Sequence, residues 1–126
     1  MKNMKEVLQS VCERAQKEIP GMIAMGIVRW EDGMSIAQAS VMPNFPTDVA
    51  CAYGTRAIDS CRNAVKAMSP KNELVEYYIF KNEYNSINKA IGQKYWLGIG
   101  LAPNANLGIA LVLLKKFEEE LMKILY

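Results

Sequence analysis

Apolar residues recur at steps of three and four positions from Met4 to Glu18, and charged or amide side chains fill the opposite side. This spacing is typical of an amphipathic helix with one buried face. Pro20 and Gly21 follow, and they favour a turn because proline biases the preceding residue away from helix and glycine readily adopts positive φ. The pattern predicts that the chain opens with a helix and then turns.

The next two segments have the pattern of a β-hairpin. Met22–Trp30 is apolar almost throughout, as expected of a buried strand, and Ser35–Ser40 alternates polar and apolar residues, as expected of a half-exposed edge strand. Between them, Asp32-Gly33 supplies the positive φ values that a tight turn needs. We expect two antiparallel strands joined by this turn.

A second helix is predicted after the loop Val41–Pro46, which contains two prolines. Thr47 or Asp48 would cap its first turn by accepting hydrogen bonds from free amides, and the helix would end near Ser69-Pro70. Four residues at helical spacing are expected to cover a sheet: Ala57, Ile58, Cys61 and Val65.

Three more strands and a final helix complete the predicted order. The strands are Leu74–Phe80, a weaker candidate at Tyr84–Ile91, and Tyr95–Leu101. The last strand leads through Asn106 into a helix over Leu107–Leu125. The order along the chain is therefore α-β-β-α-β-β-β-α.

The strand Tyr95–Leu101 indicates how the layers are arranged. Side chains alternate between the two faces of a strand, so Trp96, Gly98 and Gly100 share one face and the bulky residues between them share the other. Glycines on a strand face allow a helix to approach closely. A strand covered on both faces belongs in the middle of a sheet, so the fold class is α+β with at least one helix on each face.

Composition narrows the class of protein. The length predicts a single domain over residues 1–126, and 15 Lys and Arg against 13 Asp and Glu give a net charge of +2, with no basic cluster longer than Lys115-Lys116. Nucleic-acid binding usually needs a dense basic face, so we expect no nucleic-acid partner. The apolar runs are too short to span a membrane and the N-terminus has no signal-like apolar segment, so a cytoplasmic protein is expected.

No group of residues suggests catalysis or metal binding. The chain has no histidine, and its three cysteines, Cys12, Cys51 and Cys61, lack metal-binding spacing and are expected to be buried. The run Glu118–Glu120 lies among lysines and is expected to be solvated. We therefore expect no enzyme activity, cofactor or metal, and a nucleophilic Cys51 or Cys61 is the remaining enzymatic alternative.

Three local motifs, together with the order of elements, resemble the roadblock (dynein light chain) family. They are Ile19-Pro20-Gly21 before the first strand, Trp30-Glu31-Asp32-Gly33 at the hairpin, and Pro103-Asn104-Ala105-Asn106-Leu107-Gly108 at the entry to the last helix. The resemblance covers nearly the whole chain. It implies a profilin-like three-layer sandwich, in which one five-stranded antiparallel sheet carries the first and last helices on one face and the middle helix on the other.

The resemblance also implies a function. Domains of this family usually dimerise, pairing their third strands edge to edge and packing their middle helices together, and they serve as platforms for small Ras-like GTPases or as scaffold subunits. The leading hypothesis is therefore a non-enzymatic homodimeric adaptor or regulator. The alternative is a sensory module that holds a small apolar ligand between the sheet and the middle helix, where Gly98 and Gly100 leave room.

The third predicted strand supports the homodimer independently. Leu74–Phe80 has no proline and a single charge, so a free edge there would expose unpaired backbone groups that a second copy would pair. The simpler interpretation is that Tyr77 and Tyr78 are a core residue and its solvent-facing neighbour. The predicted dimer-interface residues are Leu74, Val75, Glu76, Tyr77, Tyr78, Tyr53, Ser60 and Ala64.

Trp30, Met34 and Met42 are candidates for contact with a partner protein. Trp30 ends the first strand beside the turn, and the two methionines lie in the hairpin and in the loop before the middle helix. Trp30 has a second interpretation, as a lid on the end of the core. Other methionines fit apolar patterns and are expected in the core, namely Met22, Met25 and Met68.

Overall fold

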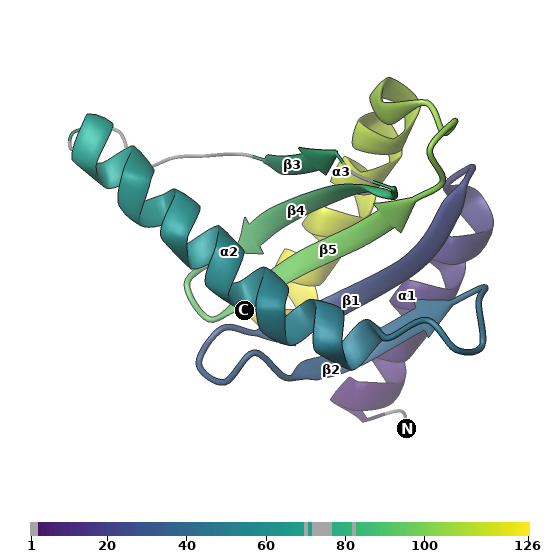
Figure 1. Cartoon of the computed structure of the whole chain (residues 1–126). Helices are drawn as coiled ribbons and strands as arrows, with labels where there is room; N and C mark the ends of the chain where they lie inside the picture. The colour runs from purple at the N-terminus through teal and green to yellow at the C-terminus, as the bar shows by residue number, and fades with distance from the viewer. Residues whose placement is uncertain (1–2, 70, 72–76, 82) are drawn as a thin grey trace.

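Eight helices and strands follow one another in the predicted order. The structure, a computed structural model, describes residues 3–69, 71, 77–81 and 83–126. The elements are α1 (Met4–Glu18), β1 (Met22–Arg29), β2 (Ser35–Ser40), α2 (Thr47–Met68), β3 (Tyr78–Lys81), β4 (Asn85–Ile91), β5 (Tyr95–Leu101) and α3 (Leu107–Leu125) (Figure 1). The weaker candidate strand is confirmed as β4.

The strands form one antiparallel sheet in the order β2-β1-β5-β4-β3. β5 lies in the middle, as its two-faced pattern predicts, and β2 and β3 form the edges. Gly33 adopts a φ of 70° in the hairpin between β1 and β2, and Gly21 adopts a φ of 80° between α1 and β1. Both glycines therefore supply the left-handed backbone that the turns require.

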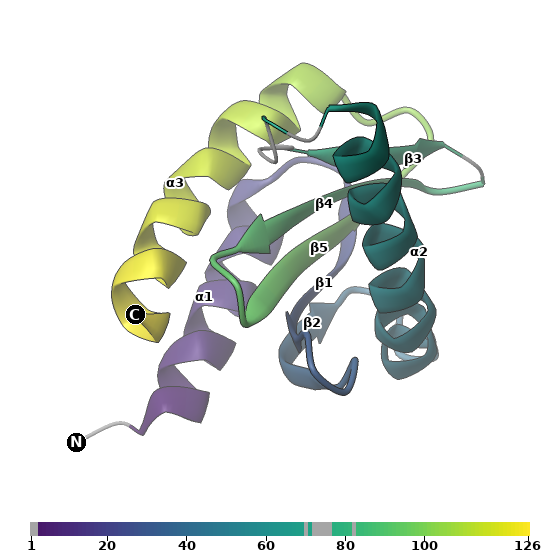
Figure 2. The same cartoon turned by 90° about the vertical axis from the view of Figure 1, so that its left-hand side faces the viewer.

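α1 and α3 cover one face of the sheet and α2 covers the other, which confirms the three-layer sandwich (Figure 2). The larger core lies between the sheet and the pair α1 and α3; its fully buried members include Leu8, Met25, Leu97, Ile99 and Phe117. α3 begins at Asn106, whose side-chain oxygen accepts a hydrogen bond of 3.0 Å from the Ile109 amide. This is a normal N-cap.

α2 is anchored to the sheet by a smaller core of Val28, Cys51, Ile58, Tyr78 and Trp96. The Trp96 ring lies under Gly54, where an added Cβ would come within 2.9 Å of the ring. The Trp96 indole N–H donates to the Thr55 hydroxyl at 2.9 Å. Trp96 therefore fixes the position of α2, because its ring packs against Gly54 and its single polar atom is hydrogen-bonded to Thr55 of the same helix.

The prediction that four residues of α2 cover the sheet is confirmed for Ile58, which is buried in the smaller core, and for Cys61, which packs against that core. Cys61 and Val65 are half-buried and Ala57 is exposed. The prediction for Met68 is also wrong, because 77% of this residue is exposed at the end of the helix. The apolar pattern of α2 is real, but no residue from Asp59 to Met68 is fully buried.

No side chain caps the start of α2, so the predicted cap is wrong. The N-cap residue is Pro46. The Thr47 hydroxyl donates to the Phe45 carbonyl at 3.5 Å, and the Asp48 carboxylate accepts a hydrogen bond of 3.2 Å from the Ser35 hydroxyl of β2. Both polar side chains therefore hold the preceding loop and the edge strand instead.

The glycines of β5 do not bring a helix close to the sheet. α2 makes its close approach over β1, where an added Cβ on Gly26 would lie 3.0 Å from the Cys51 sulfur. Beside Gly98, the space is taken by the Trp96 ring and the Asn88 side chain, both 2.7 Å from where a Cβ would be. Gly100 has no atom within 4 Å of that position, so an open space remains there.

Candidate functional site

The two edges of the sheet differ in how far they are covered. On β2, the Gln9 side chain of α1 donates to the Gln38 carbonyl at 2.7 Å and accepts from the Gln38 amide at 3.3 Å. No comparable side chain reaches the outer edge of Ile79–Lys81 among the residues that the structure describes. Among the described residues, β3 is therefore the edge that lacks such a side-chain contact.

Tyr77 and Tyr78 pack on opposite faces of the sheet. Tyr78 is buried in the smaller core, and burial raises the pKa of its hydroxyl. Tyr77 is half-buried against the larger core, with the Lys89 ammonium 5.4 Å from its ring. Neither is simply solvent-facing, and the exposed apolar residue of β3 is Ile79, at 42%. The other predicted interface residues of this segment, Leu74, Val75 and Glu76, lie outside the described residues.

The predicted interface residues of α2 share one exposed side of the helix. Tyr53, Ser60 and Ala64 are all exposed and are separated by seven and four positions, which places them along one stripe. The guanidinium of Arg56 lies 5.8 Å from the Tyr53 ring. From Asp59 to Met68 no residue of α2 is buried, and in Figure 1 this half of the helix extends beyond the strands.

The three predicted partner-contact residues do not form one site. Met34 is exposed beside the hairpin, and Trp30 is half-buried there against the smaller core, with the Arg62 guanidinium 4.5 Å from its ring. Met42 is exposed beyond the other end of β2, and eight residues of extended chain span roughly 25 Å. Trp30 closes the end of the smaller core, as its second interpretation predicts.

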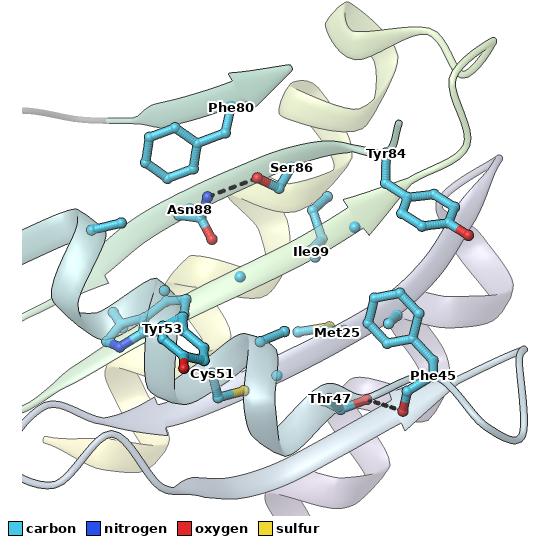
Figure 3. A pocket seen from close by; sticks show the side chains of 18 residues that line it. Met25, Phe45, Thr47, Cys51, Tyr53, Phe80, Tyr84, Ser86, Asn88 and Ile99 are labelled. Carbon is cyan, nitrogen blue, oxygen red and sulfur yellow. Dashed lines mark hydrogen bonds between the residues drawn. The ribbon is translucent and has the colours of Figure 1, made fainter. Parts of the chain in front are cut away.

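A cavity of about 330 Å³ lies between the sheet and the first half of α2 (Figure 3). Small residues of β5 and α2 leave this space open, among them Gly100 and Ala57. Phe45 and Tyr84 close one end with an edge-to-face contact of 6.0 Å between ring centroids. The space that the sequence predicts beside Gly98 and Gly100 is therefore present.

Asn88 of β4 is the polar residue that is buried in this cavity. It is 7% exposed, and its amide nitrogen donates to the Tyr78 carbonyl and to the Ser86 hydroxyl, each at 3.2 Å. Its carbonyl oxygen is turned away from both of these groups, into the cavity (Figure 3). The cavity is thus an apolar space with a fixed hydrogen-bond acceptor.

Sequence reasoning missed Phe45, Tyr84 and Asn88. Phe45 and Tyr84 sit in loops that only the fold brings together, so no spacing in the sequence connects them. The sequence did contain a signal for Asn88. This polar residue follows the apolar Ile87 in β4, and Gly98 lies directly opposite it in the neighbouring strand β5. A polar residue facing a glycine across a covered face indicates a space beside it.

Two of the three thiols, Cys12 and Cys51, are unsuited to act as nucleophiles near neutral pH. Burial raises the pKa of Cys12 to about 12, helped by the Glu13 carboxylate, and burial with the Asp48 carboxylate raises the pKa of Cys51 to about 11. Both groups are therefore protonated thiols near neutral pH. Cys61 is half-buried, which corrects the expectation that all three cysteines are buried.

Among the described residues, no three cysteine or carboxylate side chains are close enough together to hold a metal ion. Within the same part of the chain, no helix combines the length and the apolar character that crossing a membrane requires.

Comparison by sequence finds no match, either among protein-family models or among curated proteins. Comparison by structure finds solved proteins of the same shape. Myxococcus xanthus MglB is 18% identical with a TM-score of 0.86, and the match covers 99% of this chain and 92% of that one. A roadblock/LC7 domain from Streptomyces avermitilis is 11% identical with a TM-score of 0.82, covering 93% and 96%.

A more distant likeness connects the same sandwich to profilin. Acanthamoeba castellanii profilin IA is 13% identical with a TM-score of 0.60, and the match covers 94% of this chain and 98% of profilin. The resemblance seen in the sequence motifs is therefore confirmed at the level of the fold: the chain has the profilin-like sandwich of the roadblock/LC7 domains.

Proposed function

We propose that this chain is a non-enzymatic adaptor whose homodimer binds a small Ras-like GTPase. The observation that carries the proposal is the outer edge of β3, which none of the described side chains contacts as Gln9 contacts β2, together with the half of α2 that extends past the strands in Figure 1. Two copies related by a two-fold axis would pair their β3 strands and continue the sheet from one protomer into the other.

The contrast between the two edges supports pairing at β3. β2 is covered where Gln9 of α1 occupies both backbone groups of Gln38. β3 presents the exposed apolar Ile79 instead and carries one charged residue, Lys81, at its end, so most of this edge is of the apolar kind that pairs with another strand. A second β3 strand would satisfy the backbone groups and bury this side chain.

The exposed side of α2 supplies a second contact. Ser60 and Ala64 are small, so a second helix can approach closely between them, and Tyr53 and Met68 offer large exposed apolar groups at the two ends of α2. These residues would be buried together in a dimer, since β3 pairing brings the two α2 helices to the same side of the joint sheet. Packing of α2 against α2 then fixes the angle between the protomers.

Binding of a GTPase rests on the likeness to the roadblock fold and on what the resemblance implies for that family. The chain itself offers exposed apolar and aromatic groups at the β1–β2 hairpin, where Met34 is exposed and Trp30 is held by Arg62. The thiols of Cys12 and Cys51 are buried and protonated near neutral pH, so we assign a role in binding rather than catalysis.

The test uses each small Ras-like GTPase encoded in the genome that carries this chain. Each GTPase is loaded with GDP or with a non-hydrolysable GTP analogue, and its binding to the purified full chain is measured by biolayer interferometry. We expect one GTPase to bind with at least a tenfold preference between the two nucleotides. Absence of binding by all of them, in both nucleotide states, would contradict the proposal.

Met34 provides the matched variant for this test. Met34→Lys should weaken GTPase binding at least tenfold, because it places a charge in an apolar contact. Met4→Lys is the control, since Met4 is similarly exposed but lies on α1 in the opposite layer. Equal affinities of the two variants would exclude the hairpin from the interface. The GTP hydrolysis rate of the complex then separates an activator from a passive scaffold.

A further inference from the structure

The cavity under α2 differs from an ordinary packing gap in its size and lining. Its volume of about 330 Å³ is many times the space that a single water molecule needs. Its lining holds no Asp, Glu, Lys or Arg among the described residues. A charged ligand would lose its hydration there without a compensating ion pair, so the lining selects against charge.

The walls favour a flat ligand. Phe45, Phe80, Tyr84 and Trp96 contribute aromatic groups from the loops and strands around the space, and glycine and alanine residues form much of the sheet and helix surfaces between them. Figure 3 shows the rings of Phe45, Tyr84 and Phe80 arranged around a space floored by β5. Aromatic walls interact well with a planar aromatic molecule.

Asn88 supplies the orienting group. The amide nitrogen of Asn88 donates to the Tyr78 carbonyl of β3 and to the Ser86 hydroxyl of β4. The Tyr78 carbonyl can only accept, so turning the side chain over would lose this hydrogen bond and set two oxygens against each other. The carbonyl oxygen of Asn88 therefore stays in the cavity as an acceptor. A ligand that carries a single N–H or O–H donor would satisfy this oxygen while the rest of its surface is apolar.

We propose that this cavity binds a small, uncharged, planar aromatic molecule with one hydrogen-bond donor, of the size of two fused rings. The donor faces the carbonyl oxygen of Asn88, and the rings lie over Gly100 between the sheet and α2. The site shares Tyr53 with the proposed dimer contact and no residue with the hairpin surface proposed for the GTPase. Indole titration tests the ligand site and sedimentation equilibrium tests the dimer, so the failure of one proposal can be told from the failure of the other.

Indole and benzofuran form a matched pair of probes for the site. They have nearly the same shape, but the indole N–H is a donor and the benzofuran oxygen is not. Binding of each to the full chain is measured by two-dimensional NMR titration, following the Trp96 indole signal and the Asn88 side-chain amide signals. We expect indole to bind at least tenfold more tightly than benzofuran, with both residues shifting.

Gly100→Leu provides the variant that fills the site. An added Cβ at Gly100 meets no atom within 4 Å, so the leucine side chain enters the cavity without a clash at its base. This variant should lose indole binding by at least tenfold. Val112→Leu, on the exposed face of α3, is the control and should bind indole as the wild type does. If Gly100→Leu does not fold, the smaller Gly100→Val replaces it with the same expected loss.

Several results would overturn the proposal. Equal binding of indole and benzofuran would remove the role assigned to Asn88. Absence of binding by both probes, or binding that persists in the folded Gly100 variant, would remove the site. An indole affinity that falls as the chain self-associates would assign the cavity to a second copy of the chain instead of to a small molecule.

Discussion

Glu118 of α3 is buried under the sheet, and the Lys89 ammonium of β4 lies 2.9 Å from one of its carboxylate oxygens. The expectation of a solvated glutamate run is therefore wrong for Glu118, because the helix places this position toward the sheet rather than toward solvent. The other carboxylate oxygen is buried and has no hydrogen-bond partner within the part of the chain that the structure describes. The stability of this region thus depends on a single ion pair.

Replacing Lys89 tests that dependence. Lys89→Met leaves the Glu118 carboxylate buried without a counter-charge, so we expect a loss of about 3 kcal/mol in the free energy of unfolding. The double variant Lys89→Met with Glu118→Leu should recover most of this loss, because it removes the buried charge. Urea denaturation measures both. A double variant that is no more stable than Lys89→Met would show that the unpaired Glu118 carboxylate does not cause the loss of stability.

The free energy of unfolding should depend on pH through Cys12, and the raised pKa of its thiol sets the sign. Its thiol has a pKa of about 12 in the folded chain and about 8.5 when unfolded, so the folded state keeps its proton at higher pH. The resulting stability is complete below about pH 8.5 and is lost as the pH rises toward 12. The stability advantage of wild type over Cys12→Ala should therefore shrink by about 1 kcal/mol for each pH unit above 9. Parallel stability curves of the two proteins between pH 7 and 10.5 would contradict this.

At the scale of elements, β5 contains two glycines that should respond differently to an added methyl group, because one has close neighbours and the other has none. Gly98→Ala would place a Cβ 2.7 Å from both the Trp96 ring and Asn88, so we expect a loss of about 2 kcal/mol from overpacking. Gly100→Ala meets no neighbour, and it should be neutral or stabilising by up to about 1 kcal/mol. Thermal or urea unfolding of the two variants gives the comparison. Equal effects would mean that the open space beside Gly100 is absent in solution.

The elements were predictable where the pattern is local. The two-faced pattern of Tyr95–Leu101 predicts its central place, and the turn at Asp32-Gly33 predicts the hairpin. The burial of each α2 residue was not predictable, because Ala57 and Ile58 look alike in a periodic pattern, whereas in the fold Ala57 lines the open cavity and Ile58 lies in the smaller core. The loops that close the cavity with Phe45 and Tyr84 likewise depend on the complete fold.

At the scale of the whole molecule, the described residues of the sandwich do not cover the outer edge of β3, and half of α2 extends beyond the strands (Figure 1). Covering both in a single contact requires a second copy with the same arrangement, which a two-fold axis provides. A substitution that tests the dimer contact must lie outside the core, so that the fold itself is kept. Tyr78→Lys is unsuitable because Tyr78 is buried in the smaller core, whereas Ile79 is exposed at the edge itself.

Sedimentation equilibrium of the wild type and two lysine variants is the most direct measurement. The wild type should have twice the 14.1 kDa mass of one chain. Ile79→Lys should be a folded monomer, because it sets like charges near each other across the two-fold axis. Val112→Lys, at an apolar and more exposed position on α3, should remain a dimer. A monomeric wild type, or a dimer that survives Ile79→Lys but not Val112→Lys, would contradict pairing through β3.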